Sequence, residues 1–493
     1  MAESTERTPK RASAETGREP ARADLCVIGA GSAGLSIAAG ASQLGARVVL
    51  VEQGAMGGDC LNVGCVPSKA LLAAARAASL GARAAPLGVA YAAPEIDFAA
   101  VMRHVRGVVA GIAPMDSEER YAALGLRVLR GHARFLDPGS LVVEGGEAGP
   151  APRVAARRFV LATGSRPAIP PVPGLEGVAY LTNETVFQLS ALPRRLLVLG
   201  GGAVGCELGQ AFRRLGAEVT LVERDRLLTG EDPELVEPLR RQLLAEGAGL
   251  VEGARVVRVE PDGEGLALLL DGGARLVGSH LLVATARTTD FAGLGLEAAG
   301  VALDGGRLRL DGRLRTTNRR IFAAGDAAGG PCLTHLAGHH AGVVLKNALF
   351  RLPARPERSA LPRVIYGEPE LAQVGPTEAE ARARNLRFEI LRAPFFENDR
   401  ARCEGETGGL VKALVSPSGR VLGAGIVGAQ AGELILPWVL AVGGRRRIGE
   451  LAQAIVPYPT RSEASKRAAA GYLLPRLFSE RTRRLVRLLS RLG

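Results

Sequence analysis

The sequence predicts an α/β protein in which one strand–turn–helix arrangement occurs twice and is followed by a domain of mixed helices and strands. Three observations lead to this prediction. An apolar strand runs into a glycine-rich turn and an alanine-rich helix near residue 30, the same order returns near residue 200, and short strands separated by turn residues follow from about residue 356. Such strand–glycine turn–helix units are typical of nucleotide-binding sheets. The predicted fold class is therefore α/β, with two Rossmann-like dinucleotide-binding domains plus an α+β C-terminal domain.

Length and composition limit the class of protein. With 493 residues the chain is too long for one hydrophobic core, and it predicts three domains of ordinary size. No apolar run approaches the roughly 18 residues that a membrane-spanning helix needs. The net charge of +12 comes almost entirely from arginine, and no zinc-finger or aromatic–basic motif accompanies it. We therefore expect no binding to nucleic acid.

The N-terminus and the cysteine content bear on location. Residues 1–22 are rich in Glu, Ser, Thr and Arg and have no apolar core for a signal peptide, so we expect a disordered tail. The six cysteines of the chain are too few for a secreted disulfide framework and predict a cytoplasmic location. They are Cys26, Cys60, Cys65, Cys206, Cys332 and Cys403.

The first glycine-rich turn follows an apolar strand at residues 25–28. A second apolar strand at residues 46–51 ends at Glu52, 18 residues after the last glycine of the turn. Glycines in such a turn let the backbone approach a pyrophosphate at a helix N-terminus, and the acid holds a ribose hydroxyl. The residues of this turn are Gly29, Ala30, Gly31, Ser32, Ala33 and Gly34.

Cys60 and Cys65 follow this unit, with Gly64 beside the second cysteine. On an ideal helix five positions advance by roughly 7.5 Å, while a disulfide needs Cα atoms about 4.4–6.8 Å apart. The pair can close only if the helix is distorted, and Gly64 supplies that freedom. A strained, accessible disulfide is the reducible kind. The alternative is two unrelated buried thiols.

The second turn repeats the first. Strands at residues 196–199 and 219–222 flank it, and Glu223 again stands 18 residues after the last glycine. Two such folds imply two dinucleotides, and a redox disulfide between them indicates a flavin beside the disulfide and a nicotinamide cofactor in the second fold. The glycines expected to contact the nicotinamide cofactor are Gly200, Gly202 and Gly205.

Glu223 bears on which nicotinamide cofactor binds. A carboxylate accepts from a free ribose 2′-OH and repels a 2′-phosphate, which favours NADH. Arg224 and Arg226 follow directly and leave NADPH as the alternative.

A third segment is expected to complete the first nucleotide site. A short apolar strand ends at Gly325-Asp326, and a helix begins near Thr334. The positive end of that helix would face the N1–C2=O edge of a flavin, where charge accumulates on reduction. Histidines 335, 339 and 340 match no metal-site spacing, so no metal is expected.

In this order of motifs the chain resembles the class I pyridine nucleotide-disulfide oxidoreductases, which include dihydrolipoamide dehydrogenase, glutathione reductase and mercuric reductase. The resemblance covers roughly residues 23–470. It implies a homodimeric FAD enzyme in which Cys60 is the outer interchange thiol and Cys65 faces the flavin. Lys69 would lie near flavin N5 and pair with Glu207. The cofactor-binding residues expected from the motifs and the resemblance together are Gly29, Gly31, Ser32, Ala33, Gly34, Glu52, Gly58, Asp59, Lys69, Thr163, Gly164, Gly200, Gly202, Gly205, Glu223, Asp326, His335 and Ala337.

One departure from the family pattern concerns the acceptor. Members that reduce dithiols carry His-Pro-Thr-x-x-Glu near the C-terminus, whereas this chain has Tyr458 in the histidine position and ends the segment at Glu463. A phenol of pKa about 10 is a poor base compared with imidazole. Tyrosine here resembles the mercuric-reductase-like subgroup, yet the C-terminal cysteine pair and the N-terminal Cys-x-x-Cys domain of those enzymes are absent, and Cys403 is single. Ala286 stands where the family usually has a glycine before Arg287.

The C-terminal part is expected to be the dimerisation domain, which would place Tyr458 and Glu463 over the disulfide of the other subunit. Strands are predicted at residues 410–415 and 421–427, and a helix opens at residues 432–438. The last stretch places Leu485, Leu488, Leu489 and Leu492 on one face of a helix and arginines on another, which indicates a helix packed on its own domain or lying on an anionic membrane. The expected boundaries are a tail at 1–22, an FAD domain at 23–170 with 286–355, an NAD(P) domain at 171–285, an interface domain at 356–471 and a basic amphipathic helix at 472–493.

These observations predict a flavoprotein NAD(P)H oxidoreductase that passes electrons through Cys60 and Cys65 to a disulfide, a soft metal ion or another acceptor. Dihydrolipoamide dehydrogenase is the first alternative. A redox-regulated protein that binds the inner membrane surface through its C-terminal helix is an alternative of another class.

Overall fold

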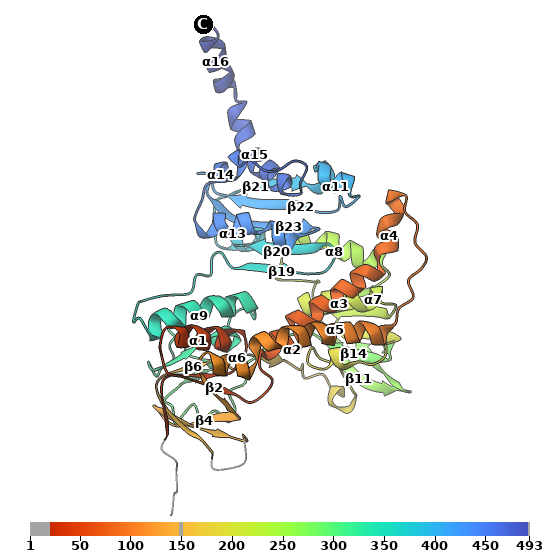
Figure 1. Ribbon diagram of the computed structural model, residues 1–493. Coiled ribbons are helices and arrows are strands. Elements are labelled where there is room, and N and C mark those ends of the chain that lie inside the picture. The colour runs from red at the N-terminus through yellow and green to blue at the C-terminus, as the bar shows by residue number, and fades with distance from the viewer. Residues whose placement is uncertain (1–19, 147–150, 492–493) are drawn as a thin grey trace, which may run out of the picture. The chain divides into compact units, whose positions relative to one another are not determined.

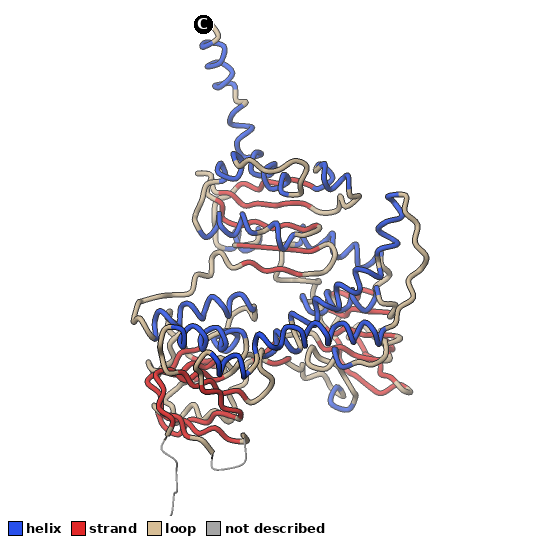
Figure 2. The backbone as a smooth tube through the Cα atoms, in the orientation of Figure 1, coloured by secondary structure: helices blue, strands red, loops and turns tan. Residues whose placement is uncertain are grey.

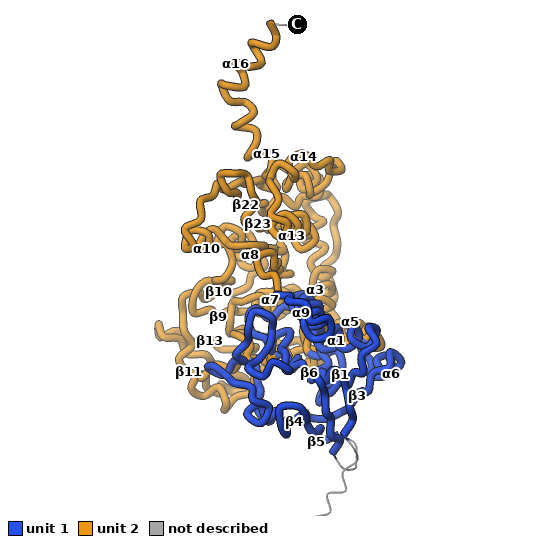
Figure 3. Tube along the Cα trace, turned by 90° about the vertical axis from the view of Figure 1, so that its left-hand side faces the viewer, with its two compact units in different colours: residues 1–58, 116–164, 289–355 blue, residues 59–115, 165–288, 356–493 orange. Residues whose placement is uncertain are grey.

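The computed structural model describes residues 20–146 and 151–491, and the chain divides into two compact units (Figure 3). Both units are assembled from segments that are far apart in the sequence. As far as they are described, residues 1–58, 116–164 and 289–355 form unit 1, and residues 59–115, 165–288 and 356–493 form unit 2.

Unit 1 is built around a seven-stranded sheet of order β3-β2-β1-β6-β5-β4, with β18 also paired to β6. Its central strands run parallel, as a strand–helix–strand unit requires. Helices α1 (Ser32–Gln43) and α9 (Thr334–Ala348) share one core with the strands they cover (Figure 1). The other elements are β1 (Ala21–Ile28), β2 (Val48–Glu52), α6 (Glu118–Ala123), β3 (Arg127–Arg130), β4 (His132–Asp137), β5 (Ser140–Glu144), β6 (Arg153–Leu161), β16 (Leu303–Asp304), β17 (Arg307–Leu308) and β18 (Ile321–Ala323).

The first strand is longer than the sequence predicted. β1 begins at Ala21, because Ala21 and Arg22 pair with Val154 and Ala155 at the start of β6. Two residues assigned to the tail are therefore sheet residues, and residues 1–19 of that predicted tail lie outside the described residues.

Unit 2 contains the second nucleotide-binding fold, a parallel sheet of order β10-β9-β8-β14 beside a three-stranded antiparallel sheet. The parallel strands and their helices are β8 (Arg195–Leu199), α7 (Ala203–Arg214), β9 (Glu218–Glu223), α8 (Pro233–Ala245), β10 (Gly249–Glu252) and β14 (His280–Val283). The remaining strands are β11 (Val256–Asp262), β12 (Gly265–Leu270), β13 (Arg275–Gly278) and the pair β7 (Arg166–Pro167) and β15 (Arg287–Thr288).

Residues 59–115 pack in unit 2, whereas the sequence predicted them to be part of the FAD domain. Helices α3 (Cys65–Ala78) and α5 (Phe98–Ile112) share a core with α7. The rings of Phe98 and Phe212 lie 6.1 Å apart in that core. The short α4 (Leu80–Ala84) follows α3. The chain carrying the cysteines is thus anchored by apolar side chains that face α7.

The C-terminal part of unit 2 is a five-stranded antiparallel sheet between helices (Figure 2). On one face α13 (Leu436–Gly443) and α15 (Ser462–Leu477) meet where the Trp438 indole donates to Ser465 Oγ at 3.0 Å. On the other face α8 packs through Leu235. The elements are β19 (Pro362–Ile365), β20 (Glu370–Val374), α10 (Glu378–Ala383), β21 (Glu389–Pro394), α11 (Asp399–Cys403), β22 (Leu410–Val415), β23 (Val421–Gly428), α12 (Ala431–Leu434), α13 (Leu436–Gly443) and α14 (Ile448–Gln453).

The strands predicted at residues 410–415 and 421–427 are confirmed as β22 and β23. The single helix predicted at residues 432–438 is instead two helices separated at Ile435. Pro437 lies in the first turn of the second helix, where its missing N–H costs nothing, but it cannot continue the preceding helix.

The C-terminal helix predicted over residues 472–493 is also divided. α15 (Ser462–Leu477) already contains Tyr472, and α16 (Glu480–Leu489) is a separate helix. Ser479 separates them by accepting a hydrogen bond from the Thr482 amide, which caps the N-terminus of α16. Among the described residues, no helix combines the length and apolar character needed to cross a membrane.

Candidate functional site

The glycine-rich turn after β1 owes its shape to close backbone packing. Gly29 has a φ of +104°, and a Cβ on it would collide with the carbonyl of Ala162. A Cβ on Gly34 would collide with the carbonyl of Gly29, whereas one on Gly31 would meet only Gly58 Cα at 3.8 Å. The outer glycines are therefore required by the turn, and the middle one leaves its backbone accessible to a phosphate group.

The turn after β8 repeats this geometry. Gly200 has a φ of +115° and approaches the carbonyl of Ala284, and a Cβ on Gly205 would collide with the carbonyl of Gly200. A Cβ on Gly202 would meet nothing within 4 Å. The two turns form the same local structure, each with one backbone position open for a nucleotide.

Glu52 and Glu223 also have equivalent surroundings. Glu52 accepts from the amides of Ala30 at 2.5 Å and Gly54 at 2.6 Å. Glu223 accepts from Gly201 at 2.7 Å and from Asp225 at 3.1 Å. Each carboxylate fixes its own turn and, with about four acceptor positions, retains capacity for a ribose hydroxyl.

The third predicted segment reaches the first turn within unit 1. Gly325 has a φ of +63°, and a Cβ on it would contact the methyl groups of Ala33 and Ala337 at 3.2 and 3.4 Å. These small residues bring the turn that carries Asp326 against the N-terminal parts of α1 and α9. The helix predicted near Thr334 begins there, and His335 is its second residue.

Thr163 contributes a buried hydroxyl to the same unit. Its Oγ1 has no hydrogen-bond partner among the described residues, and Gly164 after it has a φ of +70°. A buried polar atom of this kind is normally satisfied by protein, water or ligand. The hydroxyl and the open backbone at Gly31 fit a dinucleotide cofactor in unit 1.

The helix that carries the cysteines is interrupted between them. α2 (Gly58–Asn62) contains Cys60, and α3 begins at Cys65. A Cβ on Gly64 would lie 2.9 Å from the carbonyl oxygen of Asp59 and 3.3 Å from Cys60 Cα, so only glycine permits this approach. The distortion predicted from the cysteine spacing is present, with Cys60 half-buried and Cys65 exposed.

Arg287 holds this interrupted helix in place, a role that no motif in the sequence indicates. Its guanidinium pairs with Asp59 and donates to Ser165 Oγ at 2.7 Å. Asn183 Oδ1 lies 3.5 Å from the same guanidinium, and Asn183 Nδ2 donates to the carbonyl of Val63 at 3.2 Å. Arg287 is thus connected directly to Asp59, which precedes Cys60, and through Asn183 to Val63, which lies two residues before Cys65.

Lys69 and Glu207 form the expected ion pair. Lys69 Nζ lies 2.8 Å from Glu207 Oε2, and Glu207 is buried. The other carboxylate oxygen accepts from the Tyr366 amide at 2.9 Å, and the ammonium lies 4.4 Å from the centroid of the Tyr366 ring. Burial, followed by the charge of Glu207, raises the pKa of Tyr366. Tyr366 is a residue that motif reasoning missed.

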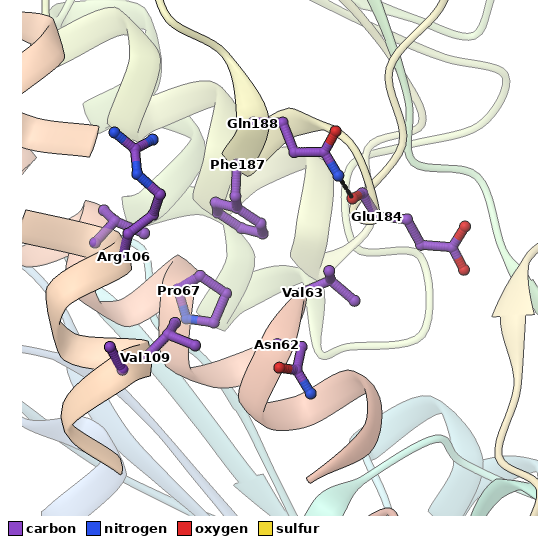
Figure 4. A pocket seen from close by; sticks show the side chains of 10 residues that line it. Asn62, Val63, Pro67, Arg106, Val109, Glu184, Phe187 and Gln188 are labelled. Atoms are coloured by element: carbon purple, nitrogen blue, oxygen red, sulfur yellow. Dashed lines mark hydrogen bonds between the residues drawn. The ribbon is translucent and has the colours of Figure 1, made fainter. Parts of the chain in front are cut away.

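A cavity of about 460 Å³ adjoins the segment between the cysteines (Figure 4). Asn62, Val63 and Pro67 form one side, Phe187 contributes an aromatic wall, and Arg106 lies at the rim. A cavity of this size accommodates a small organic molecule, which would lie against the residues between Cys60 and Cys65.

Tyr458 lies far out on the surface of unit 2, with 71% of the residue exposed. Its hydroxyl donates to Asp399 Oδ2 at 3.2 Å, and this hydrogen bond raises the pKa of the phenol. Glu463 accepts from the Thr460 amide at 3.3 Å. Because the raised pKa leaves less phenolate at neutral pH, Tyr458 is even less available as a base than its residue type predicts.

Three of the other cysteines lie in surroundings that differ from those of Cys60 and Cys65. Burial raises the pKa of Cys26 and Cys206, which keeps both thiols protonated and unreactive. Cys403 ends α11 on the surface. The described residues contain no group of three or more His, Cys, Asp or Glu side chains that could hold a metal ion.

Sequence comparisons give the family. Residues 23–341 match the model of pyridine nucleotide-disulphide oxidoreductases, and residues 361–469 match the dimerisation domain of the same family. A mercuric reductase of Streptomyces lividans is 38% identical over 453 residues, covering 90% of this chain and 95% of that protein. A dihydrolipoyl dehydrogenase of Thermus scotoductus is 38% identical over 469 residues, covering 90% and 96%.

Solved structures agree with this assignment. LpdA from Mycobacterium tuberculosis superposes with a TM-score of 0.84 at 28% identity, covering 92% of this chain and 99% of that chain. The Cu(II) complex of the HOCl-induced flavoprotein disulfide reductase RclA from Escherichia coli gives 0.82 at 26% identity, covering 91% and 99%. The resemblance stated from the motifs is confirmed: the chain belongs to the class I pyridine nucleotide-disulphide oxidoreductases and is a flavoprotein disulfide oxidoreductase of a family that uses FAD and NAD(P)H.

Proposed function

We propose that this protein takes electrons from NADH and delivers them through Cys60 and Cys65 to a disulfide, a soft metal ion or another oxidant. The observation that carries the proposal is the close approach of Gly64 to the backbone of Cys60, since it interrupts the helix at the place where two cysteines five positions apart must meet. Two unrelated buried thiols on one helix would not require the helix to be interrupted.

The cofactor assignment rests on the two glycine turns. We assign FAD to unit 1, where Gly31 leaves open backbone and Thr163 offers a buried hydroxyl, and the nicotinamide cofactor to the turn at Gly202. When bound, FAD supplies two-electron chemistry between hydride and dithiol. Gly58 approaches Gly31 closely, and Cys60 follows it by two residues. The chain therefore keeps the Cα of Cys60 within about 7 Å of the Cα of Gly58.

Lys69 and Cys60 have distinct roles in this proposal. The ammonium of Lys69 is held by Glu207 and covered by the Tyr366 ring, so it is a fixed positive charge four residues after Cys65. A positive charge in this position favours the thiolate form of Cys65. Cys60 as thiolate attacks one sulfur of the acceptor disulfide; the acceptor S–S bond breaks, its other sulfur leaves as a thiolate, and a mixed disulfide with Cys60 forms. Cys65 then displaces the reduced acceptor, which restores the Cys60–Cys65 bond.

The weak base at position 458 favours an acceptor that needs thiolates more than it needs proton transfer. Soft metal ions bind thiolates directly, and relatives whose names are mercuric reductase and Cu(II)-bound RclA agree with this class. A dihydrolipoyl dehydrogenase activity is the second candidate, supported by the identity to the Thermus protein.

An acceptor screen tests the proposal. The purified holoenzyme with NADH is offered lipoamide, glutathione disulfide, Hg(II), Cu(II) and quinones in parallel. We expect reduction of at least one soft metal ion to exceed lipoamide reduction. Efficient turnover of lipoamide alone would establish the second candidate instead.

Substitution Tyr458→His is expected to raise dithiol–disulfide activity. Histidine in place of the phenol would supply a base that titrates near neutral pH, and Asp399 would still be present to orient it. We expect kcat/KM for lipoamide to rise by about tenfold or more, and Tyr458→Phe to leave it unchanged. Equal activity of the histidine variant and the parent protein would mean that proton transfer does not limit the acceptor step.

Substitution Glu223→Gln is expected to shift cofactor choice towards NADPH. The amide oxygen can still accept from Gly201, its NH2 group replaces the oxygen that accepts from Asp225, and the negative charge that repels a 2′-phosphate is removed. The ratio of kcat/KM for NADH to that for NADPH should fall by about tenfold or more. The isosteric Glu237→Gln, at a partly exposed side chain of α8, serves as the control. An unchanged ratio for the variant at position 223 would show that this carboxylate does not select the cofactor.

A further inference from the structure

Helix α16 has an apolar face that nothing in the described part of the chain covers. None of its residues is buried, and Figure 1 shows it standing clear of the sheet and helices of its own unit. Leu485, Leu488 and Leu489 are 53%, 57% and 55% exposed. The alternative in which this helix packs on its own domain is therefore not what the structure shows.

The exposed leucines form one continuous face. At 100° per residue Leu485 and Leu489 lie side by side, Leu488 borders them, and Arg483 and Arg487 lie on the opposite side. The end of α15 extends the apolar surface with residues that are also exposed: Leu474, Leu477 and Phe478. Leu492, which was predicted to join the face, lies outside the described residues.

The charge of this segment decides between a second copy of the helix and a lipid surface. Residues 474–491 contain six arginines and one glutamate, Glu480. Glu480 pairs with Arg483 and Arg487, and Arg481 and Arg484 have no ion pair among the described residues. At 100° per residue Arg481 and Arg484 lie nearest the leucine face, so two helices packed through their leucines would bring these uncompensated positive charges together, whereas anionic headgroups would neutralise them.

We propose that α16 binds the surface of an anionic membrane. Its leucine face enters the boundary between headgroups and acyl chains, and its arginines remain at the level of the phosphates. The dimerisation-domain match supports a homodimer, and a homodimer carries two copies of this helix. The inference is independent of the electron acceptor.

Flotation of the full-length holoenzyme with lipid vesicles tests this proposal. We expect the protein to float with vesicles of phosphatidylcholine and phosphatidylglycerol, to float poorly with phosphatidylcholine alone, and to be released by high salt. The double variant Leu485→Ser with Leu489→Ser keeps every charge and should bind at least about tenfold more weakly. Its NADH-dependent activity should equal that of the parent protein.

A matched control removes two exposed aliphatic residues elsewhere. Leu244 and Val257 are 44% and 43% exposed, and their replacement by serine should leave flotation unchanged. Flotation of the leucine variant equal to that of the parent would overturn the proposal that the leucine face enters the membrane, because charge alone would then account for binding. Absence of flotation, together with larger oligomers that the leucine variant disperses, would assign the face to a second copy.

Discussion

Replacement of Cys60 by serine is expected to abolish reduction of disulfide and metal acceptors while the protein still binds FAD and oxidises NADH with an artificial dye. A serine hydroxyl neither forms the bond to Cys65 nor attacks an acceptor disulfide at neutral pH. The FAD-binding features of unit 1 contain no atom of Cys60, so cofactor content should not change. We expect kcat/KM for the acceptor to fall by about a thousandfold or more.

Thiol titration gives a readout that does not depend on turnover. One NADH carries two electrons, which convert the Cys60–Cys65 disulfide into two thiols with uptake of a proton. The oxidised parent protein should therefore gain two titratable thiols after anaerobic addition of NADH, and the Cys60→Ser variant should gain none. Cys403→Ser, which removes an exposed cysteine on α11, should behave as the parent. Retained acceptor reduction in the Cys60 variant would refute the proposed electron path.

Local constraints were predictable from the sequence. The glycine turns were predicted correctly because a side chain on an outer glycine would collide with nearby backbone. The Ala162 carbonyl, for example, leaves no room for a Cβ on Gly29. The distortion between Cys60 and Cys65 followed from a distance that an ideal helix cannot satisfy. In these cases a few residues close in sequence determine the geometry.

Contacts between distant segments were not predictable in the same way. Arg287 and Asp59 are separated by 228 positions, and nothing around either residue indicates the other. Tyr366 lies on Lys69 only because the segment after β19 is brought to Glu207 by the fold. The assignment of residues 59–115 differed for the same reason, since their partners lie on α7. The single helices expected near residues 435 and 478 were divided by a proline and a capping serine.

Loss of the Lys412 ammonium is expected to destabilise the fold strongly. It is a buried residue of β22, and its ammonium lies 2.8 Å from an oxygen of each of three carboxylates, Asp232, Glu234 and Glu378. Two arginines complete the cluster, Arg392 on Glu234 and Arg382 on Glu378. With Lys412 present the three cations balance the three anions.

The pKa shifts agree with a cluster that depends on charge balance. Burial alone would lower the pKa of Lys412, but hydrogen bonds to the three carboxylates raise it above its ordinary value. The hydrogen bond from Arg392, assisted by Lys412, lowers the pKa of Glu234 to about 2. A carboxyl group with a depressed pKa contributes stability above its unfolded pKa near 4.5, and this contribution is lost as the pH falls towards 2.

The substitution Lys412→Met should lower the free energy of unfolding by about 3–5 kcal/mol at pH 7, because it leaves three carboxylates with two arginines inside unit 2. In the variant the carboxyl groups can bind protons and so avoid remaining charged without a cation. The difference in the free energy of unfolding between variant and parent should therefore shrink as the pH falls below 4.5. Urea unfolding at a series of pH values measures both effects. Lys466→Met, at a partly exposed lysine on α15 with no ion pair in the described chain, should change stability by less than about 0.5 kcal/mol. A deficit at position 412 that is equally large at pH 4 and pH 7 would show that packing of the alkyl chain, and not the ammonium, is what the sheet requires from Lys412.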